Sequence, residues 1–165
     1  MGENLALEGR DAIRTPMQWD GGRGAGFSVA DPDELVNPIP TRGNFAARRV
    51  NVRDESRDAG SLLRWFEQLI RVLRECPEIG VGTPSVLDLP LPRAVLAHRF
   101  DAPEGSILLL HNLADRPVTV DLGSVEATDQ TYEVFADAAY DPLGRRLTGL
   151  RLNGWGYRWI RLRRG

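Results

Sequence analysis

The strongest hydrophobic pattern lies at residues 60–76, where apolar side chains recur with the period of an α-helix. At about 100° per residue they fall within an arc of about 180°, and charged or polar residues fill the other side. The apolar set is Leu62, Leu63, Trp65, Phe66, Leu69, Ile70, Val72 and Leu73. Ser61 or Asp58 can cap the start of this helix, and Pro77 is expected to end it near Cys76. An arc this wide predicts packing against more than one neighbour.

Residues 81–165 follow a different pattern, in which short runs of branched and aromatic residues alternate with turn residues. The runs predict strands at 85–89, 94–100, 106–113, 118–122, 132–135, 148–152 and 156–162. Because no helical stretch separates them, the strands are expected to pair antiparallel in a β-sandwich. Trp155, Tyr157 and Trp159 are spaced two apart, which would put the three rings on one face of the last strand.

Residues 1–59 show no sustained period and are rich in turn-forming residues. An irregular stretch longer than about 15 residues is uncommon inside a compact domain. This segment also carries apolar side chains that a freely disordered tail rarely contains, namely Ile13, Met17, Trp19, Phe27 and Phe45. The pattern therefore favours a segment shaped to lie against something absent from this sequence over a disordered tail.

Composition and charge exclude several function classes. The 23 acidic and 21 basic residues give a net charge of −2, whereas a nucleic-acid-binding domain is normally clearly basic. No apolar run approaches the ~20 residues of a membrane span, and residues 1–10 lack the apolar core of a secretory signal. The sequence thus predicts no nucleic-acid partner, no membrane partner and a cytoplasmic location.

The residue types that most often carry chemistry are few. The sequence contains one cysteine, Cys76, and two histidines, His98 and His111, so neither a disulfide framework nor a cysteine- or histidine-rich metal site is expected. Cys76 follows a predicted helix C-terminus, which lacks the pKa-lowering field of a helix N-terminus. Both histidines lie in predicted strands, which favours structural roles. The sequence predicts no metal ion and no cofactor.

Two further patterns have both a structural and a functional interpretation. The glycine-rich segment 21–26 lacks the GK[ST] ending of a phosphate-binding loop and is interpreted as a turn. Asp31/Asp33/Glu34 and Asp54/Glu55 are near neighbours in sequence, an arrangement that does not ordinarily give the two facing carboxyl groups, about 5 Å apart, of a retaining glycosidase. No catalytic residue is predicted in this sequence.

Several motifs resemble one known family. Residues 14–19, RTPMQW, and residues 25–28, AGFS, resemble a stretch of glycoside hydrolase family 13, the α-amylase family, in its trehalose synthase and oligo-1,6-glucosidase branch. The resemblance continues through VNV at 50–52, SLLRW at 61–65 and ECPEIG at 75–80, and residues 108–122 are similar to the family's C-terminal domain. It covers nearly the whole chain.

The resemblance implies a (β/α)8 barrel followed by a β-sandwich. Residues 1–80 would be the last barrel loop and the final barrel helix, at about 60–76, and residues 81–165 the sandwich domain. The expected fold class is mainly β, with an antiparallel C-terminal sandwich preceded by one amphipathic helix and a long irregular segment. The family's catalytic Asp nucleophile, Glu acid/base and second Asp lie on earlier strands, and no residue here matches them.

In this family the RTPMQW loop borders the substrate pocket. The resemblance therefore implies that Arg14 lies near the sugar subsites, where its guanidinium offers several donors in a fixed fork, and that Trp19 packs the loop or stacks on a sugar face. An α-glucan or disaccharide is expected to bind only in a complete barrel. The expected protein partner is a barrel polypeptide, or a second copy through the helix face, because that face would stay exposed in isolation.

Three interpretations remain open on the sequence. The first is the C-terminal portion of a trehalose-synthase-like enzyme, which acts through a covalent glucosyl-enzyme and is catalytically incomplete in these residues alone. The second is a free-standing β-sandwich module that binds carbohydrate or protein, with the rings of Trp155, Tyr157 and Trp159 either in the core or as a sugar platform. The third is a truncation of a longer gene product.

Overall fold

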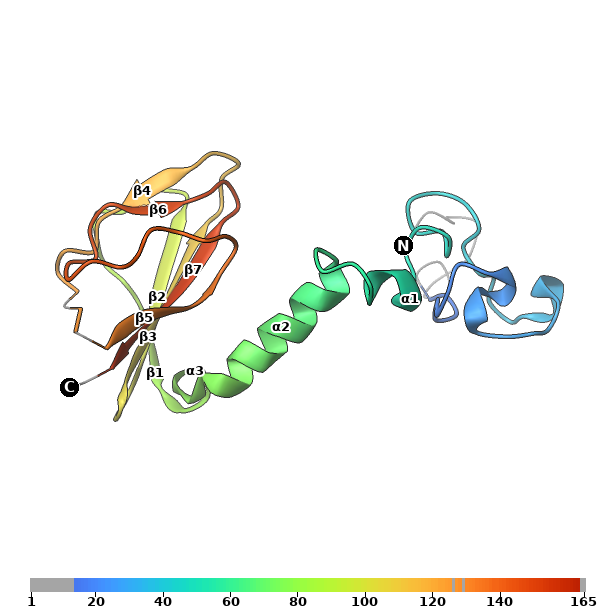
Figure 1. Ribbon diagram of the computed structural model, residues 1–165, viewed down its shortest axis with the longest axis horizontal. Coiled ribbons are helices and arrows are strands. Elements are labelled where there is room, and N and C mark those ends of the chain that lie inside the picture. Colours follow the sequence, from blue (N-terminus) through green and yellow to red (C-terminus); the bar gives the residue numbers. More distant parts are fainter. Residues whose placement is uncertain (1–13, 126, 129, 164–165) are drawn as a thin grey trace. The chain divides into compact units, whose positions relative to one another are not determined.

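The computed structural model describes residues 14–125, 127–128 and 130–163 (Figure 1). The chain forms two compact units, one up to Leu69 and the other from Ile70 onward. Helix α2, Leu62–Glu75, contains the last residues of the first unit and the first residues of the second. The expected division after residue 80 separates barrel-derived from sandwich residues, and it stays a prediction.

The second unit is an antiparallel β-sandwich, which confirms the expected fold class. Its described residues form β1 Thr83–Val86, β2 Val95–Ala102, β3 Gly105–Asn112, β4 Val118–Val120, β5 Thr131–Ala136, β6 Leu150–Leu152 and β7 Tyr157–Arg163. One sheet has the order β1-β2-β3-β7-β5, and β4 pairs with β6 in the other (Figure 1). All of these pairings are antiparallel. Each predicted strand overlaps one observed strand.

The core of this unit joins alternate residues of β3 and β7 to apolar residues of β4, β6 and the loops between them. The core cluster comprises Ala97, Leu108, Leu110, Val120, Leu122, Val125, Leu147, Leu150, Leu152, Ile160 and Leu162. Burying one such large side chain stabilises a fold by roughly 1.5–3 kcal/mol. A slip of one residue would turn this set away from the second sheet, so packing between the two sheets fixes the strand register.

A row of rings lies on the opposite face of the five-stranded sheet. His98 and His111 stack with ring centroids 5.5 Å apart and an interplanar angle of 11°. Trp159 packs edge-on against Phe135 at 5.3 Å, and Tyr157 lies 4.9 Å from Phe135. Trp159 is only 7% exposed, so its indole ring is part of the packed interior.

Trp155 does not belong to this row, and the expectation that it shares a face with Tyr157 and Trp159 is wrong. Strand β7 begins at Tyr157, and Trp155 lies in the preceding turn with a φ of 56°. Its amide donates a hydrogen bond to the Ala114 carbonyl at 2.7 Å. A residue in the left-handed region interrupts the alternation of side chains along a strand. Residues two positions apart on either side of it therefore need not share a face of the sheet.

The stacked histidines make the stability of the chain depend on pH. Burial lowers the pKa of His98, and burial together with the neighbouring His98 charge lowers the pKa of His111. An unfolded histidine titrates near about 6.5, so below that pH the unfolded chain binds more protons than the folded one. We expect the free energy of unfolding to fall as the pH drops from 7.5 to about 5.5.

Urea unfolding at several pH values measures this loss. His98→Phe removes one of the two titrating rings from the stack and is expected to reduce the pH dependence over the same interval. Equal stability of the unaltered chain at both ends of the interval would contradict the assignment.

Helix α2 forms where the apolar period predicts it, and its ends have identifiable causes. The Ser61 hydroxyl accepts a hydrogen bond from the Arg64 amide at 3.2 Å, so Ser61 is the N-cap that the sequence offered. The Glu55 carboxylate accepts a second bond from the Leu63 amide at 3.4 Å. Pro77 opens the separate helix α3, Pro77–Val81, because proline is tolerated in a first turn but not in a helix interior.

The apolar face of α2 is largely uncovered. No residue of this helix is buried, and Leu62, Phe66, Ile70 and Leu73 each keep between 38% and 65% of their surface exposed. These four positions follow the i, i+4 and i, i+3 spacing of a single stripe. The exposed apolar surface expected from the sequence is therefore present.

Candidate functional site

The first unit brings two of the sequence motifs together. The Gln18 side-chain amide donates to the Val50 carbonyl at 2.6 Å, and the Val52 amide donates to the Gln18 carbonyl at 2.9 Å. The Arg53 amide donates to the Trp19 carbonyl at 3.0 Å. The end of the stretch that runs from Arg14 to Trp19 is thus hydrogen-bonded to residues more than thirty positions away. The unit nevertheless has little regular secondary structure.

A tight turn follows Trp19 and fixes its backbone. The Ala25 carbonyl accepts hydrogen bonds from the Trp19 amide at 2.8 Å and from the Asp20 amide at 3.1 Å. Gly24, Ala25 and Gly26 all have positive φ, at 69°, 52° and 65°. The 3-10 turn η2, Arg23–Gly26, therefore closes a hydrogen-bonded loop that begins at Trp19.

The glycine-rich segment is a turn, as the sequence indicated, because its groups are used internally. The Ala25 amide donates to the Gly22 carbonyl at 3.0 Å, and the Phe27 amide donates to the Gly24 carbonyl at 2.8 Å. A phosphate cradle presents such amides to a ligand, whereas these two are already satisfied within the turn.

Asp20 links this turn to helix α1, Val52–Glu55. One carboxylate oxygen accepts from the Gly22 amide at 2.8 Å, and the other accepts from the Arg53 guanidinium at 2.8 Å. A side chain at position 26 would have its Cβ 2.9 Å from the Asp20 carboxylate, so Gly26 is required for this approach. This role of Asp20 was not predicted, although an Asp-Gly-Gly run is a recognisable turn signal.

Asn51 caps α1 and is buried, with 2% of its surface exposed. Its side-chain oxygen accepts from the Asp54 amide at 3.0 Å, and its side-chain nitrogen donates to the Ala47 carbonyl at 2.8 Å. Helix α1 was not predicted, since four residues are too few to show a hydrophobic period. The N-cap asparagine followed three residues later by an acid was the signal that could have located it.

Three of the acidic neighbours weighed in the sequence form side-chain contacts within the first unit. Asp54 forms its bonds with Asn51, and the Glu55 carboxylate caps α2. Asp31 pairs with Arg23, and both side chains are exposed. That neither acidic group is a catalytic dyad stays a prediction.

Several large side chains near the turn after Trp19 are exposed. Met17, Trp19 and Phe27 are 50%, 51% and 51% exposed, and Arg14 is exposed as well. Large apolar side chains at half exposure on a hydrogen-bonded loop mark a surface that another part binds or covers. The loop thus presents two aromatic rings, a thioether and a guanidinium on a fixed backbone.

The other candidate groups lie in the second unit. Cys76 is buried, and burial, the larger effect, raises the pKa of its thiol above the usual value despite the nearby Arg161 cation. This matches a structural cysteine rather than a nucleophile. Within the described part of the chain, no group of three or more histidine, cysteine, aspartate or glutamate side chains is placed to hold a metal ion. No described helix is long and apolar enough to span a membrane.

Comparisons with known proteins match both units. The family model described as "Alpha amylase, catalytic domain" matches residues 1–81, and the model described as "Sucrose hydrolase-like, C-terminal domain" matches residues 105–161. The trehalose synthase of Pimelobacter sp. (strain R48) is 33% identical over 168 residues, which cover 98% of this chain and 29% of the relative. The oligo-1,6-glucosidase of Bacillus cereus is 35% identical over 138 residues, 80% of this chain and 23% of the relative.

Solved structures show the same fold. The crystal structure of isomaltulose synthase (PalI) from Klebsiella sp. LX3 aligns with a TM-score of 0.69 and 25% identity, covering 98% of this chain and 27% of that chain. The chain spans less than a third of the length of the curated trehalose synthases that it matches. These matches cover the RTPMQW loop, the helix and the sandwich together. The chain belongs to glycoside hydrolase family 13, the α-amylase family, in the branch that includes trehalose synthase and oligo-1,6-glucosidase.

Proposed function

We propose that this chain is the C-terminal part of an α-glucosyl-transferring enzyme that interconverts maltose and trehalose, and that it is catalytically incomplete by itself. The observation that carries the proposal is the similarity to trehalose synthases along 98% of the chain, whereas the match to the Bacillus cereus oligo-1,6-glucosidase covers 80%. The chain would supply the last barrel loop, the final barrel helix and the sandwich. The three catalytic acids of the retaining mechanism would come from the preceding barrel strands. The whole enzyme would act in the cytoplasm.

Arg14 and Trp19 are the residues of this chain that would face the sugar. The anchored turn supports this role, since the Trp19 backbone is held from both sides by Ala25 and Arg53. A fixed loop can present a guanidinium to sugar hydroxyls without losing much conformational entropy on binding. Trp19 would either pack this loop against the barrel or offer a flat face to a glucose ring.

The apolar stripe of α2 would be covered by the rest of the barrel. Leu62, Phe66, Ile70 and Leu73 provide a stripe about three turns long, which suits a helix that packs on a neighbouring layer. In the isolated chain the same stripe is expected to mediate self-association. Light scattering would then give a mass above 18.3 kDa, and a monodisperse monomer at high concentration would contradict this expectation.

A chimera tests the role of Arg14. The 165 residues replace the matching stretch of the Pimelobacter trehalose synthase, and turnover of maltose is measured. Hydrogen bonds to a charged group are worth about 1.5–3 kcal/mol, so Arg14→Ala is expected to lower kcat/KM for maltose roughly 10- to 150-fold.

The matched control is Arg23→Ala, which removes an exposed arginine that pairs with Asp31 in the same unit. Its kcat/KM is expected to stay within about twofold of the unaltered chimera, because exposed ion pairs contribute little. An active, folded chimera in which both variants turn over maltose equally well would overturn the assignment of Arg14.

A further inference from the structure

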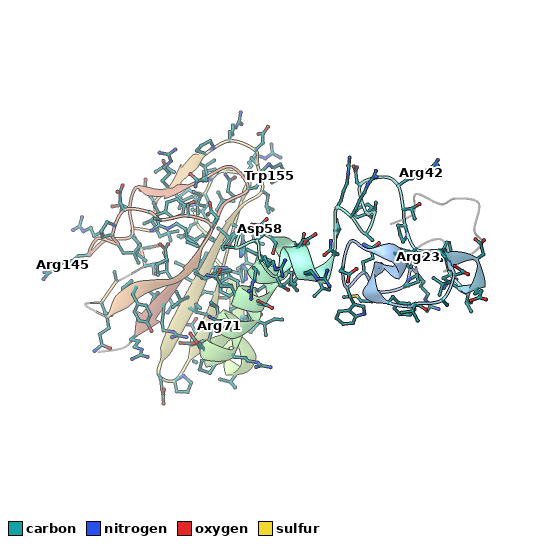
Figure 2. All side chains as sticks on the ribbon, turned by 45° about the vertical axis from the view of Figure 1, so that its right-hand side comes forward. Arg23, Arg42, Asp58, Arg71, Arg145 and Trp155 are labelled. Atoms are coloured by element: carbon teal, nitrogen blue, oxygen red, sulfur yellow. The ribbon has the colours of Figure 1, made fainter. Side chains whose placement is uncertain are left out.

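Trp155 occupies an unusual position in the sandwich. It lies in the turn that joins β6 to β7, and 67% of its surface is exposed (Figure 2). Its φ of 56° is in the left-handed region, which disfavours residues with a Cβ and is rare for bulky side chains. A large apolar ring is thus held out to solvent on a backbone that glycine or asparagine would adopt at lower cost.

The turn that carries Trp155 is rigid because its backbone is bonded on both sides. The Trp155 amide donates to the Ala114 carbonyl at 2.7 Å, and the Gly156 amide donates to the Asn153 carbonyl at 3.0 Å. A Cβ at Gly154 would lie 2.1 Å from the Asp115 carbonyl oxygen, so the turn and the facing loop are in close backbone contact.

A polar network behind the turn fixes it further. The Asn153 amide donates to the Tyr140 hydroxyl at 3.0 Å, and its side chain donates to the Asp137 carboxylate at 3.1 Å. The same carboxylate accepts from the Tyr140 hydroxyl at 2.7 Å and from the Tyr157 amide at 2.8 Å. The Asn112 side chain donates to the Asn153 carbonyl at 2.7 Å. The ring is therefore presented on a preorganised support.

The loop whose backbone contacts the Trp155 turn carries polar side chains. Asp115 and Arg116 are exposed in the facing loop, and they supply acceptor and donor groups for hydroxyls. The face of an aromatic ring is electronegative, so it attracts the C–H groups on the flat side of a glucopyranose. A stable protein interface buries about 800 Å² on each partner and has an apolar centre. One ring beside charged residues offers a much smaller apolar area.

We propose that Trp155 is the stacking platform of a surface site for an α-linked glucan chain. Asp115 and Arg116 would bond the hydroxyl rim of a glucose unit stacked on the indole. The choice of α-linked glucose rests on the family to which the chain belongs, whereas the site itself depends on neither Arg14, Trp19 nor a catalytic acid. It would hold a longer glucan on the sandwich without any bond being broken.

Native gels that contain amylopectin test the proposal on the 165-residue chain, with maltoheptaose as the soluble competitor. The chain is expected to migrate more slowly in amylopectin, and maltoheptaose to restore its mobility. Trp155→Asn should raise the dissociation constant for amylopectin at least about tenfold. It removes the ring while keeping a residue that tolerates the left-handed backbone. Trp155→Phe should keep part of the retardation.

Two controls separate binding from folding. Trp155→Asn is expected to melt at or above the temperature of the unaltered chain, since backbone strain is relieved. Val86→Ala removes another exposed apolar side chain of the sandwich, 71% exposed on β1, and should leave the retardation unchanged. The proposal is overturned if the unaltered chain is not retarded, or if Trp155→Asn is retarded as strongly as the unaltered chain. Neither result bears on maltose turnover by the chimera.

Discussion

Replacing Arg161 with alanine is expected to cost about 3–5 kcal/mol of unfolding free energy, the largest effect of any single substitution considered for this chain. Arg161 and Glu78 are 7% and 8% exposed, and Nε and Nη2 of the arginine lie 2.7 and 2.9 Å from the two carboxylate oxygens. Nη2 also donates to the Glu75 carbonyl at 2.6 Å, and Nη1 donates to the Tyr132 hydroxyl at 3.0 Å. Alanine would leave a buried carboxylate without its cation.

Denaturation by urea, followed by circular dichroism, measures this loss. Arg163→Ala is the matched control, because Arg163 ends the same strand with an exposed side chain, and its change should stay within about 0.5 kcal/mol. The pair Arg161→Met with Glu78→Leu removes both charges and is expected to recover most of the stability. A loss below about 1 kcal/mol for Arg161→Ala would show that the pair does not hold α3 to the sheet.

The second largest effect is expected for Leu108→Ala, at about 2–5 kcal/mol. Leu108 has no exposed surface and pairs with Ile160 across β3 and β7, in the middle of the core between the two sheets. The cost combines the lost transfer free energy of the side chain with the cavity that remains. The rigid strand pairing on both sides of β3 limits how far the site can collapse.

Leu96→Ala serves as the control for this substitution. Leu96 lies on β2 of the same sheet and is 41% exposed, so its truncation should cost less than about 1 kcal/mol. Urea unfolding of the two variants under one condition gives the comparison. Equal losses for Leu96→Ala and Leu108→Ala would contradict the placement of the core between the sheets.

The sandwich could be predicted from the sequence because short apolar runs alternate with turn residues along it. Leu108 and Leu110, like Ile160 and Leu162, lie two positions apart in such runs and belong to the core cluster. The same logic failed at Trp155, where a positive φ interrupts the strand and puts the ring in a turn. Nothing in the residue type indicates this conformation, since tryptophan rarely adopts it.

The candidate site was harder to predict, because its geometry depends on contacts between distant residues. The motif around Arg14 and Trp19 was recognisable by resemblance, but its attachment to residues 50–53 arises from single hydrogen bonds without any periodic pattern. Likewise, the Asp20–Arg53 pair joins residues 33 positions apart. Such pairs become visible only when the fold brings them together.

The most direct test of the central claim is trehalose formation from maltose, measured by NMR for the 165-residue chain alone and for the chimera with the Pimelobacter barrel. We expect no turnover by the chain alone and formation of trehalose by the chimera, because this chain supplies a loop, a helix and a sandwich but not the catalytic acids. A folded chimera that forms no trehalose, or an isolated chain that does, would contradict it.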